Sequence, residues 1–335
     1  MPPTTRPRLG FLGVGWIGRN RLEAIAGAGV ADIVAVADAA PEAAIDAAAA
    51  VGADVADADR VLTDGGLDGV VIATPSALHA EQATTALRAG RAVFCQKPLG
   101  RTAAECAEVV DAARTADLLL GVDLSYRHLA AVAAIRDLLA ADAIGDIYAA
   151  DLVFHNAYGP DKPWFLDPAR SGGGCVIDLG IHLVDLAMWL LAGTSGDWPK
   201  VEAVTSRLFA DGRPLGPTPD VVEDYATARL DLANGAAVNL SCSWFLHAGR
   251  EAVIGATLHG TRGSVELRNV SGSFYDFVAV HNTGTQQRTL VEPPDDWGGR
   301  AAVSWARRLA NGDRFDPAAT ELVDVAHVLD GIYGR

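Results

Sequence analysis

The stretch from Arg8 to Gly18, Arg-Leu-Gly-Phe-Leu-Gly-Val-Gly-Trp-Ile-Gly, constrains the fold of this chain more than any other. A short apolar run leads through glycines into a segment with helical spacing, which predicts a strand that turns directly into a helix. Gly13 permits the tight turn, Gly15 lets backbone approach a pyrophosphate, and Gly18 brings the helix close to the strand. The free N–H groups and positive dipole end of that helix favour phosphate, so a dinucleotide site is predicted. Its expected contacts here are Gly13, Gly15, Trp16, Ile17 and Gly18.

A second apolar strand, residues 32–37, follows the first helix and ends at Asp38, 20 residues beyond Gly18. A carboxylate at that place can accept hydrogen bonds from the adenosine ribose hydroxyls. It would also repel a 2′-phosphate, and residues 39–42 supply no arginine or lysine to bind one. The sequence therefore predicts NAD rather than NADP, the alternative being a solvated aspartate in a turn.

Strand and helix patterns alternate over residues 8–122, which predicts a doubly wound parallel sheet. Two of its strands, residues 69–73 and 92–95, are short and apolar, as in sheets that are buried on both faces. Each is followed by a polar loop, Thr74-Pro75-Ser76 after the first and Gln96-Lys97-Pro98 after the second. Open parallel sheets bind their ligands at the carboxyl ends of the strands. Lys97 is therefore a site candidate, with an ordinary surface lysine as the alternative.

The pattern changes at Tyr126, after which apolar and polar residues alternate in several segments. Asn234-Gly235 between two of them is a favoured type I′ hairpin signal, so antiparallel pairing is expected. We predict an α+β domain with an open, mostly antiparallel sheet over residues 124–335, after a Rossmann domain over residues 1–123. The expected strands are residues 147–155, 201–208, 225–232, 236–244, 252–258 and 264–269, with helices at 126–140, 301–309 and 317–329.

Charge and composition exclude several classes of partner. The net charge is −15, with 42 acidic against 27 basic residues that form no stripe, so nucleic acid and anionic membranes are excluded as main partners. Residues 1–8 have no apolar leader segment, and a cytoplasmic protein is expected. The four cysteines form no Cys-x-x-Cys pair, which favours small core residues over disulfides or a zinc site.

A second candidate site lies in the stretch from Ser171 to Asp185, where three glycines lead into an apolar helix. Asp178, His182 and Asp185 stand at i, i+4 and i+7, on one face of that helix. Gly180 costs the helix about 1 kcal/mol relative to alanine, which indicates that a ligand or backbone comes close there. The polar stripe is predicted to be catalytic. The alternatives are a hydrogen-bonded structural pair and a set of metal ligands.

These motifs together resemble the Gfo/Idh/MocA oxidoreductases, a family named for glucose-fructose oxidoreductase and inositol dehydrogenase. The likeness covers nearly the whole chain. Its segments are Gly13–Gly18, Thr74-Pro75-Ser76 with His79, Lys97-Pro98, Gly172–Asp185 and His259–Gly263. It implies a nicotinamide-binding Rossmann domain and a second domain whose open mixed sheet often builds the oligomer interface. A homo-oligomer, either dimer or tetramer, is therefore expected.

The resemblance also implies site residues. Lys97, Asp178 and His182 correspond to the family's catalytic trio. The further cofactor contacts that it implies are Thr74, Pro75, Ser76, His79, Gln96 and Lys97. One position departs from the pattern, because Gln96 stands where the family usually has glutamate before the lysine.

The chemistry can be argued from the residues themselves. Removing a hydride from a secondary alcohol leaves an alkoxide, so the site needs a proton acceptor and a positive charge near that oxygen. His182 as the base, oriented by Asp178, with Lys97 as the positive charge is our first hypothesis. The rival assignment makes Lys97 the base, a role that Gln96 in place of glutamate would ease.

Further substrate contacts are expected from Arg127, His155, Tyr158 and Trp164, where aromatic side chains stand beside polar groups ahead of the glycines. A salt bridge is the alternative for Arg127, and a loop packed on its own domain is the alternative for the aromatics. The predicted function is an NAD-dependent dehydrogenase or reductase of a sugar, cyclitol or related polyol. Two alternatives share the scaffold: an NAD-retaining glycosidase or lyase, and a nucleotide-sensing regulator without turnover.

Overall fold

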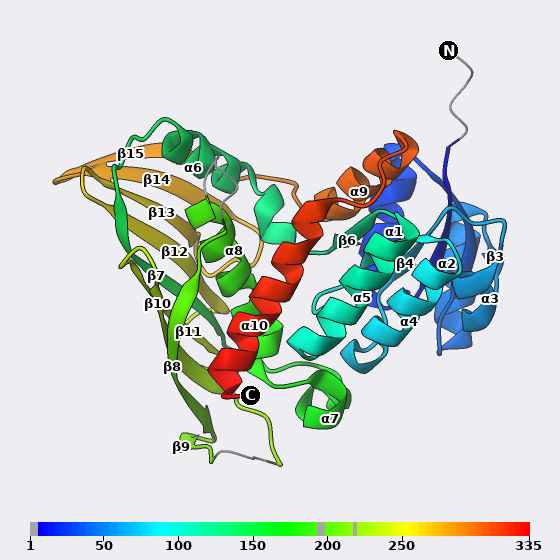
Figure 1. The fold of residues 1–335 in the computed structure, drawn as a ribbon, viewed down its shortest axis with the longest axis horizontal. Coiled ribbons are helices and arrows are strands. Elements are labelled where there is room, and N and C mark those ends of the chain that lie inside the picture. The colour runs from blue at the N-terminus through cyan, green and yellow to red at the C-terminus, as the bar shows by residue number, and fades with distance from the viewer. Residues whose placement is uncertain (1–5, 193–197, 217–219) are drawn as a thin grey trace. The chain divides into compact units, whose positions relative to one another are not determined.

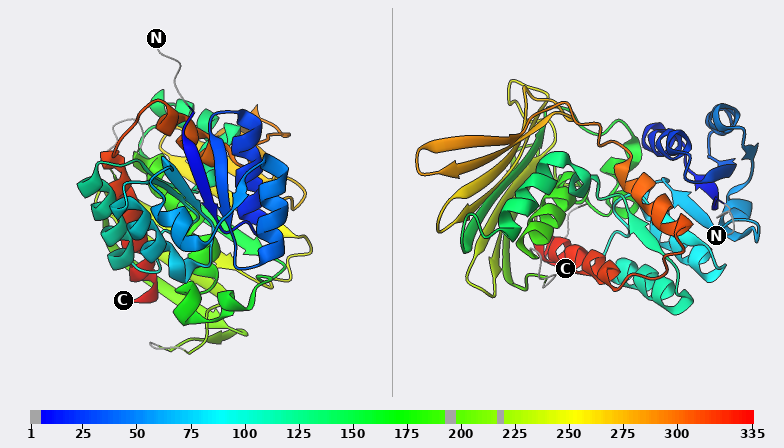
Figure 2. Two further views of the ribbon diagram at one scale, coloured as in Figure 1. Left: turned by 90° about the vertical axis from the view of Figure 1, so that its right-hand side faces the viewer. Right: turned by 90° about the horizontal axis from the view of Figure 1, so that it is seen from above.

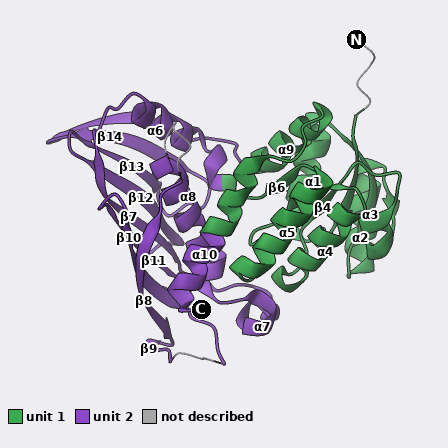
Figure 3. Cartoon of the chain, in the orientation of Figure 1, with its two compact units in different colours: residues 1–125, 298–324 green, residues 126–297, 325–335 purple. Residues whose placement is uncertain are grey.

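The computed structural model describes residues 6–192, 198–216 and 220–335. Most of the segment on which the leader expectation depends, residues 1–5, lies outside these ranges. The chain forms two compact units (Figure 3). Unit 1 comprises Met1–Ser125 and Gly298–Asp324, and unit 2 comprises Tyr126–Trp297 and Val325–Arg335.

Unit 1 is built on a parallel sheet whose six described strands run in the order β3-β2-β1-β4-β5-β6 (Figure 1). These strands are β1 (Arg8–Leu12), β2 (Asp32–Ala37), β3 (Asp54–Val55), β4 (Gly69–Ile72), β5 (Ala92–Cys95) and β6 (Leu120–Val122). The connecting helices are α1 (Trp16–Ala28), α2 (Pro41–Val51), α3 (Ala58–Thr63), α4 (Ser76–Arg88) and α5 (Ala103–Ala116). This strand order is that of a Rossmann fold, and the predicted doubly wound sheet is confirmed.

Unit 1 also contains α9 (Arg300–Ala310) and the 3-10 turn η4 (Pro317–Thr320), which come from far along the chain. The side chain of Trp305 on α9 occupies space that glycines leave open: a Cβ at Gly69 or Gly121 would lie 2.9 or 2.7 Å from its ring. Its ring centroid is 5.7 Å from that of Phe94 on β5. The sequence analysis assigns this segment to the second domain, but its apolar face is buried on the first sheet.

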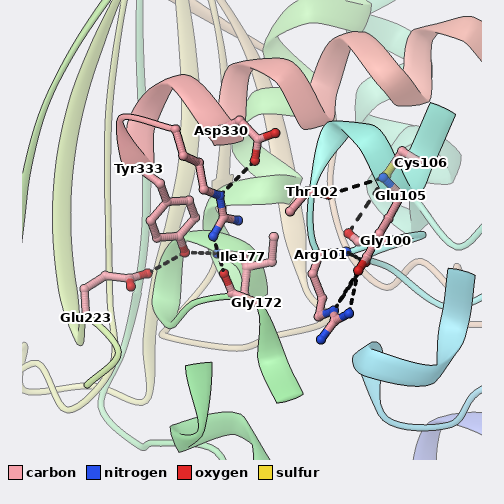
Figure 4. Close-up of polar contacts among 11 residues, drawn as sticks. Gly100, Arg101, Thr102, Glu105, Cys106, Gly172, Ile177, Glu223, Asp330 and Tyr333 are labelled. Carbon is pink, nitrogen blue, oxygen red and sulfur yellow. Dashed lines mark hydrogen bonds and ion pairs between the residues drawn. The ribbon is translucent and has the colours of Figure 1, made fainter. Parts of the chain in front are cut away.

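The start of α5 carries a capping box in a modified form (Figure 4). Thr102 Oγ1 accepts the N–H of Glu105 at 3.2 Å, as in a capping box. The Glu105 carboxylate accepts the N–H of Arg101, one residue earlier than the motif requires, at 2.7 Å. It also pairs with the Arg101 guanidinium, which closes the segment that follows Pro98 against the helix.

Unit 2 contains a mixed sheet whose nine described strands run in the order β15-β14-β13-β12-β7-β11-β10-β8-β9. They are β7 (Ile147–Asn156), β8 (Val201–Ala210), β9 (Arg213–Pro214), β10 (Tyr225–Leu232), β11 (Ala237–Ser243), β12 (Ala252–Gly260), β13 (Ser264–Asn269), β14 (Phe277–Thr283) and β15 (Gln286–Val291). Strand β7 is central, parallel to β11 and antiparallel to β12. The other pairs are antiparallel, so the expected open, mostly antiparallel sheet is confirmed.

The helical segments of unit 2 include a short first turn and a long last helix. They are η1 (Ser125–His128), which begins at the last residue of unit 1, α6 (Ala130–Ala140), η2 (Pro163–Leu166), α7 (Pro168–Ser171), η3 (Val176–Gly180), α8 (Ile181–Ala192) and α10 (Glu321–Tyr333), whose first four residues belong to unit 1. Figure 2 shows α6, α8 and the later part of α10 against one face of the sheet. We call this the inner face. The opposite, outer face carries Asp151, Val153 and His155 of β7.

Two details of the second sheet differ from the sequence prediction. In the β10–β11 hairpin only Gly235 has a positive φ, +85°, among the turn residues, so the turn is not type I′. The hydrogen bond from Leu232 N to Ala236 O closes a three-residue loop, the arrangement in which glycine forms a bulge. The β14–β15 hairpin is absent from the prediction because residues 286–289, Gln-Gln-Arg-Thr, are polar and show no alternation.

Within the described residues, one continuous helical stretch, Pro168–Ala192, is long and apolar enough to cross a membrane. Inside unit 2, 78% of its most apolar window is buried. Burial of that extent is typical of the core helix of a folded unit, and α8 contributes Val184, Ala187 and Met188 to the core against the inner face.

Candidate functional site

The glycine turn between β1 and α1 has the geometry that its sequence predicts. Gly13 has a φ of +87°, and a Cβ at this position would lie 2.5 Å from the carbonyl oxygen of Ala73. A Cβ at Gly18 would lie 2.2 Å from the oxygen of Gly13. A Cβ at Gly15 would meet nothing within 4 Å, so the turn is open on that side. Two glycines are therefore required by close packing, and the third leaves space for a ligand.

The amino terminus of α1, which follows Gly15, is suited to an anion. No side chain caps it, and its first turn contains no acidic residue. The helix begins with Trp16, whose side chain is 72% exposed, followed by Ile17. Asp38 lies beside the turn: its Oδ2 accepts the N–H of Val14 at 2.7 Å and its Oδ1 accepts that of Ala40 at 2.8 Å. Each carboxylate oxygen can accept a second hydrogen bond, so Asp38 retains capacity for ribose hydroxyls. These residues fit a dinucleotide, with the pyrophosphate at the helix terminus.

The loops after β4 and β5 are tied together by His79. Its ring nitrogens lie 2.7 Å from the oxygen of Pro98 and 2.6 Å from that of Thr74, and its side chain is 1% exposed. Burial lowers the pKa of His79. Both ring nitrogens thus meet backbone oxygens in this structure, and the cofactor contact expected of His79 stays a prediction. Thr74 Oγ1 in turn donates to Gln82, and Ser76 at the start of α4 is buried with Pro75 as its N-cap.

Lys97 lies two residues after the last residue of β5, at the carboxyl edge of the parallel sheet, as predicted. Gln96 before it is 8% exposed, and its side-chain amide donates to the carboxylate of Asp123 at the end of β6. In unit 1 the structure thus brings the glycine turn, Asp38, the loop after β4 and Lys97 to the carboxyl ends of neighbouring strands.

In unit 2 the predicted catalytic helix is not a continuous α-helix. Residues Val176–Gly180 form a π-helical turn, and α8 begins at Ile181. A π-turn changes the phase of the side chains, so the stripe expected from i, i+4 and i+7 does not hold for Asp178, His182 and Asp185. A Cβ at Gly180 would lie 3.4 Å from Cys242 Sγ on β11. This is an ordinary van der Waals distance, so packing against the sheet does not require a glycine at position 180.

Asp178 and His182 are surrounded by aromatic side chains. Trp244 Nε1 donates to Asp178 Oδ2 at 3.1 Å, and the Tyr126 ring lies 5.0 Å from that of His182, centroid to centroid. The ring of Phe154 on the inner face of β7 lies 6.3 Å from His182. Burial raises the pKa of Tyr126 well above its usual range, with smaller contributions from nearby acidic groups.

Sequence reasoning missed both Trp244 and Tyr126 as neighbours of the predicted pair. The available signals were slight: Trp244 ends a predicted strand, and Tyr126 marks the change of pattern. Their contacts depend on pairing between segments far apart in the chain.

Asp185 forms an ion pair with Arg127. The guanidinium makes a bidentate pair with the carboxylate at 2.6 and 3.0 Å, and the Asp185 side chain is 2% exposed. Burial raises the pKa of Asp185, while the Arg127 charge opposes this shift. Arg127 also lies over the rings of Trp189 and Trp198 at 5.5 and 5.8 Å. Within unit 2, Arg127 therefore makes the salt bridge that was the alternative to a substrate contact. Among the described residues no group of three or more His, Cys, Asp or Glu side chains could hold a metal ion.

The aromatic candidates are not gathered in one place. His155 lies on the outer face, opposite to Phe154, where its ring contacts the hydroxyls of Ser243 and Ser241 at 2.8 and 3.2 Å. Because His182 contacts the inner face, the structure separates His155 from it. Burial lowers the pKa of His155.

The two other aromatic candidates differ in their surroundings. Tyr158 is 55% exposed, and its hydroxyl contacts Glu251 at 3.3 Å. Trp164 stacks on Phe165 at 3.8 Å, and Phe165 packs edge-on against Trp244, 6.4 Å between ring centroids. Because Trp244 donates to Asp178, a chain of contacts through Phe165 and Trp244 links Trp164 to this acid.

Glu223 is a buried acid beside the glycines that precede the π-turn, and sequence reasoning missed it; Figure 4 shows its contact with the Tyr333 hydroxyl. Glu223 is 2% exposed; its carboxylate accepts the N–H groups of Gly174 at 3.0 Å and Val176 at 2.9 Å and the hydroxyl of Tyr333 at 2.8 Å. A Cβ at Gly174 would lie 1.9 Å from the Glu223 backbone oxygen, and one at Gly173 2.0 Å from the Tyr333 hydroxyl. The glycines are therefore required by packing in the turn that leads to Asp178.

A parallel sheet in Rossmann order, with an open glycine turn and an uncapped helix terminus, defines a dinucleotide-binding protein. Residues 8–124 match the model of an oxidoreductase family with an NAD-binding Rossmann fold, and residues 132–266 match the GFO/IDH/MocA C-terminal domain. The chain belongs to the Gfo/Idh/MocA oxidoreductase family, as its motifs indicated.

Several proteins of known activity are similar to this chain. It is 32% identical over 222 residues to 1,5-anhydro-D-fructose reductase of Ensifer adhaerens, covering 66% of this chain but only 62% of that enzyme's length. It is 31% identical over 331 residues to inositol 2-dehydrogenase of Rhizobium meliloti, covering 95% of both. A solved structure of levoglucosan dehydrogenase, in complex with NADH and L-sorbose, superimposes with a TM-score of 0.81 at 26% identity, covering 98% of this chain and 96% of that chain.

Proposed function

We propose that this protein is an NAD-dependent dehydrogenase or reductase that acts on a hydroxyl or keto carbon of a sugar, cyclitol or related polyol. The observation that carries the proposal is the uncapped start of α1 beside the open side of Gly15, with the Asp38 carboxylate bonded to the backbone of the same turn. The similar proteins support the substrate class, because they are named for activity on inositol, levoglucosan and 1,5-anhydro-D-fructose. Family membership supports the reaction type.

The mechanism assigns one task to each group. Bound nicotinamide would supply the hydride acceptor. The amino terminus of α1 binds the pyrophosphate, and Asp38 binds the adenosine ribose. We assign His182 as the acceptor of the substrate hydroxyl proton, Asp178 as the group that orients it, and Lys97 as the positive charge that stabilises the alkoxide. Trp244 holds the Asp178 carboxylate through its indole N–H.

We expect purified protein to form NADH when NAD is combined with one member of a polyol panel that contains myo-inositol, levoglucosan and D-glucose. The measurement is absorbance at the NADH wavelength over a pH series, because the proton released favours oxidation at alkaline pH. Turnover of a glycoside without net NADH would instead indicate a glycosidase or lyase that retains its NAD. Cofactor binding without turnover of any panel member would indicate a regulator.

Cofactor choice provides a second prediction. We expect kcat/KM with NAD to exceed that with NADP by at least about tenfold, since the Asp38 carboxylate repels a 2′-phosphate. Asp38→Ala should weaken NAD binding and reduce the NAD/NADP ratio. Asp32→Ala, which removes an exposed carboxylate from the other end of β2, is the matched control. A wild-type enzyme that turns over NADP as well as NAD would contradict the assignment of Asp38.

We further propose a homo-oligomer, dimer or tetramer, located in the cytoplasm. The proposal of assembly comes from the family resemblance, since the open mixed sheet of the family often builds the oligomer interface. The outer face of the unit 2 sheet, with Asp151, Arg207, Thr227 and Ser241, is the corresponding surface in this chain. Support for the compartment is that Cys95, Cys106, Cys175 and Cys242 are all buried free thiols.

A further inference from the structure

A buried polar cluster lies at the carboxyl edge of the unit 1 sheet, beside Lys97. Its centre is Asp123, which follows β6 and is 1% exposed. Arg21 of α1, 6% exposed, donates from Nε to Asp123 Oδ2 at 2.6 Å. The Gln96 amide and the Ser125 hydroxyl also donate to this carboxylate. The cluster therefore joins the glycine helix to the ends of two neighbouring strands.

The donors and acceptors in this cluster are balanced. An ionised carboxylate can only accept, so the Gln96 side chain must present its nitrogen to Asp123. Arg21 contributes the one positive charge, and its remaining nitrogens contact Asn20 Oδ1 at 2.5 Å and Ser125 Oγ at 3.1 Å. A glutamate at position 96 would place oxygen against oxygen, with one guanidinium for two buried carboxylates.

Backbone hydrogen bonds also hold the residues just before Lys97. Gln96 N–H donates to the Ile72 oxygen of β4 at 2.8 Å, and Asp123 N–H donates to the Cys95 oxygen of β5 at 2.9 Å. The backbone at Gln96 is thus held to one strand, and its side chain is held to the next. Lys97 is the next residue, so its position at the sheet edge depends on both attachments.

We propose that Gln96 and Asp123 form a positioning pair for Lys97, in which Asp123 provides the single buried negative charge and the Gln96 amide is required because that charge is already present. Neither residue is a catalytic residue under this proposal. The proposal rests on the proposed function only for the role of Lys97 in stabilising the alkoxide. The pair itself consists of contacts within unit 1. The effect of Gln96 in place of glutamate, left open by the sequence, is explained by Asp123.

The first test is Gln96→Glu, which adds a carboxylate to the cluster. The two acids should share a proton at low pH and repel each other when both are ionised, so the deficit in Tm should grow from pH 5 to pH 8, reaching roughly 5 °C. With the polyol that gives NADH in the screen, kcat should fall roughly ten- to a hundredfold while KM for NAD changes little, because a displaced Lys97 affects the reaction more than cofactor binding. Gln287→Glu, the same change at an exposed site on β15, should alter neither quantity.

The second test is rescue. Asp123→Asn alone leaves Arg21 buried without its counter-charge and should lower Tm and kcat. Gln96→Glu with Asp123→Asn restores one carboxylate facing one amide and should recover most of both losses. A Gln96→Glu variant that behaves like Gln287→Glu, or a double variant no better than the worse single variant, would overturn the pairing. Absence of polyol turnover in the wild type would contradict the proposed function alone, since the pH dependence of Tm tests the pair without substrate.

Discussion

His182→Ala is expected to lower kcat for polyol oxidation by about 10²- to 10⁴-fold, the usual contribution of a positioned general base. The histidine lies between Tyr126 and Phe154 on the inner face of unit 2, and nothing in those contacts replaces a proton acceptor. NADH binding, followed by fluorescence titration, should change little because the cofactor residues are in unit 1. His327→Ala, an exposed histidine on α10, is the matched control.

Lys97→Met distinguishes the two assignments of the base. If His182 is the base, Lys97→Met should lower kcat but keep the acidic limb of the pH–rate profile, whereas His182→Ala should abolish that limb. If Lys97 is the base, Lys97→Met should abolish the acidic limb and His182→Ala should keep it. Solvent isotope effects on kcat check the result, because the variant that lacks the base should lose the proton transfer step. Normal turnover in His182→Ala would show that our assignment is wrong.

The second large effect is expected from Glu223→Ala, which should destabilise the protein by roughly 2–5 kcal/mol. The change leaves two backbone N–H groups and the Tyr333 hydroxyl buried without their shared acceptor. Turnover should fall as well, because these bonds hold the turn that leads to Asp178. Thermal denaturation measures the first effect. Tyr333→Phe removes one of these bonds and the bond that the Tyr333 hydroxyl accepts from Ile177 N–H, and should cost less, about 1–2 kcal/mol.

The raised pKa of Glu223 predicts the direction in which its contribution to stability changes with pH. Burial raises the pKa of Glu223 above its ordinary value of 4.5, although hydrogen bonds oppose the shift. A carboxyl group whose pKa is raised by folding contributes stability that is fully present below the unfolded pKa and is lost as the pH rises through the folded pKa. Glu223→Gln does not titrate, so its stability relative to the wild type should improve from pH 4 upward. A difference that stays constant from pH 4 to pH 8 would contradict a raised pKa for this group.

Sequence alone determined the Rossmann unit and its glycine turn. Apart from the two-residue, exposed β3, each described strand of this sheet is a short, mostly apolar run. The helix signals, such as Pro41 at the first position of α2 and Gly52 after its end, are local. A dinucleotide site needs a strand, a turn and a helix that are consecutive in the chain, so its residues are visible without knowledge of long-range contacts. The Lys97 loop was predictable for the same reason, since it ends a strand of the same sheet.

Tertiary structure alone decided the surroundings of the second candidate site. Spacing indicated Asp178 and His182 but not the π-turn. The Trp244 donor and the Glu223 anchor lie 40 or more residues away in the chain, so spacing could not indicate them either. The side of the sheet taken by His155 follows from the alternation along β7 together with the face that the helices cover. The alternation is visible in the sequence, but the face that the helices cover is not.

The assignment of residues 298–324 to unit 1 was also decided by tertiary structure. The helix pattern of α9 is evident in the sequence, but an amphipathic helix does not indicate which sheet it covers. That choice depends on Gly69 and Gly121, whose missing side chains make room for Trp305. Patterns local in the chain therefore determined the elements and the cofactor turn. Packing between distant segments decided which buried charges and aromatic rings surround the candidate catalytic groups, because burial and pairing are properties of contacts and not of residue order.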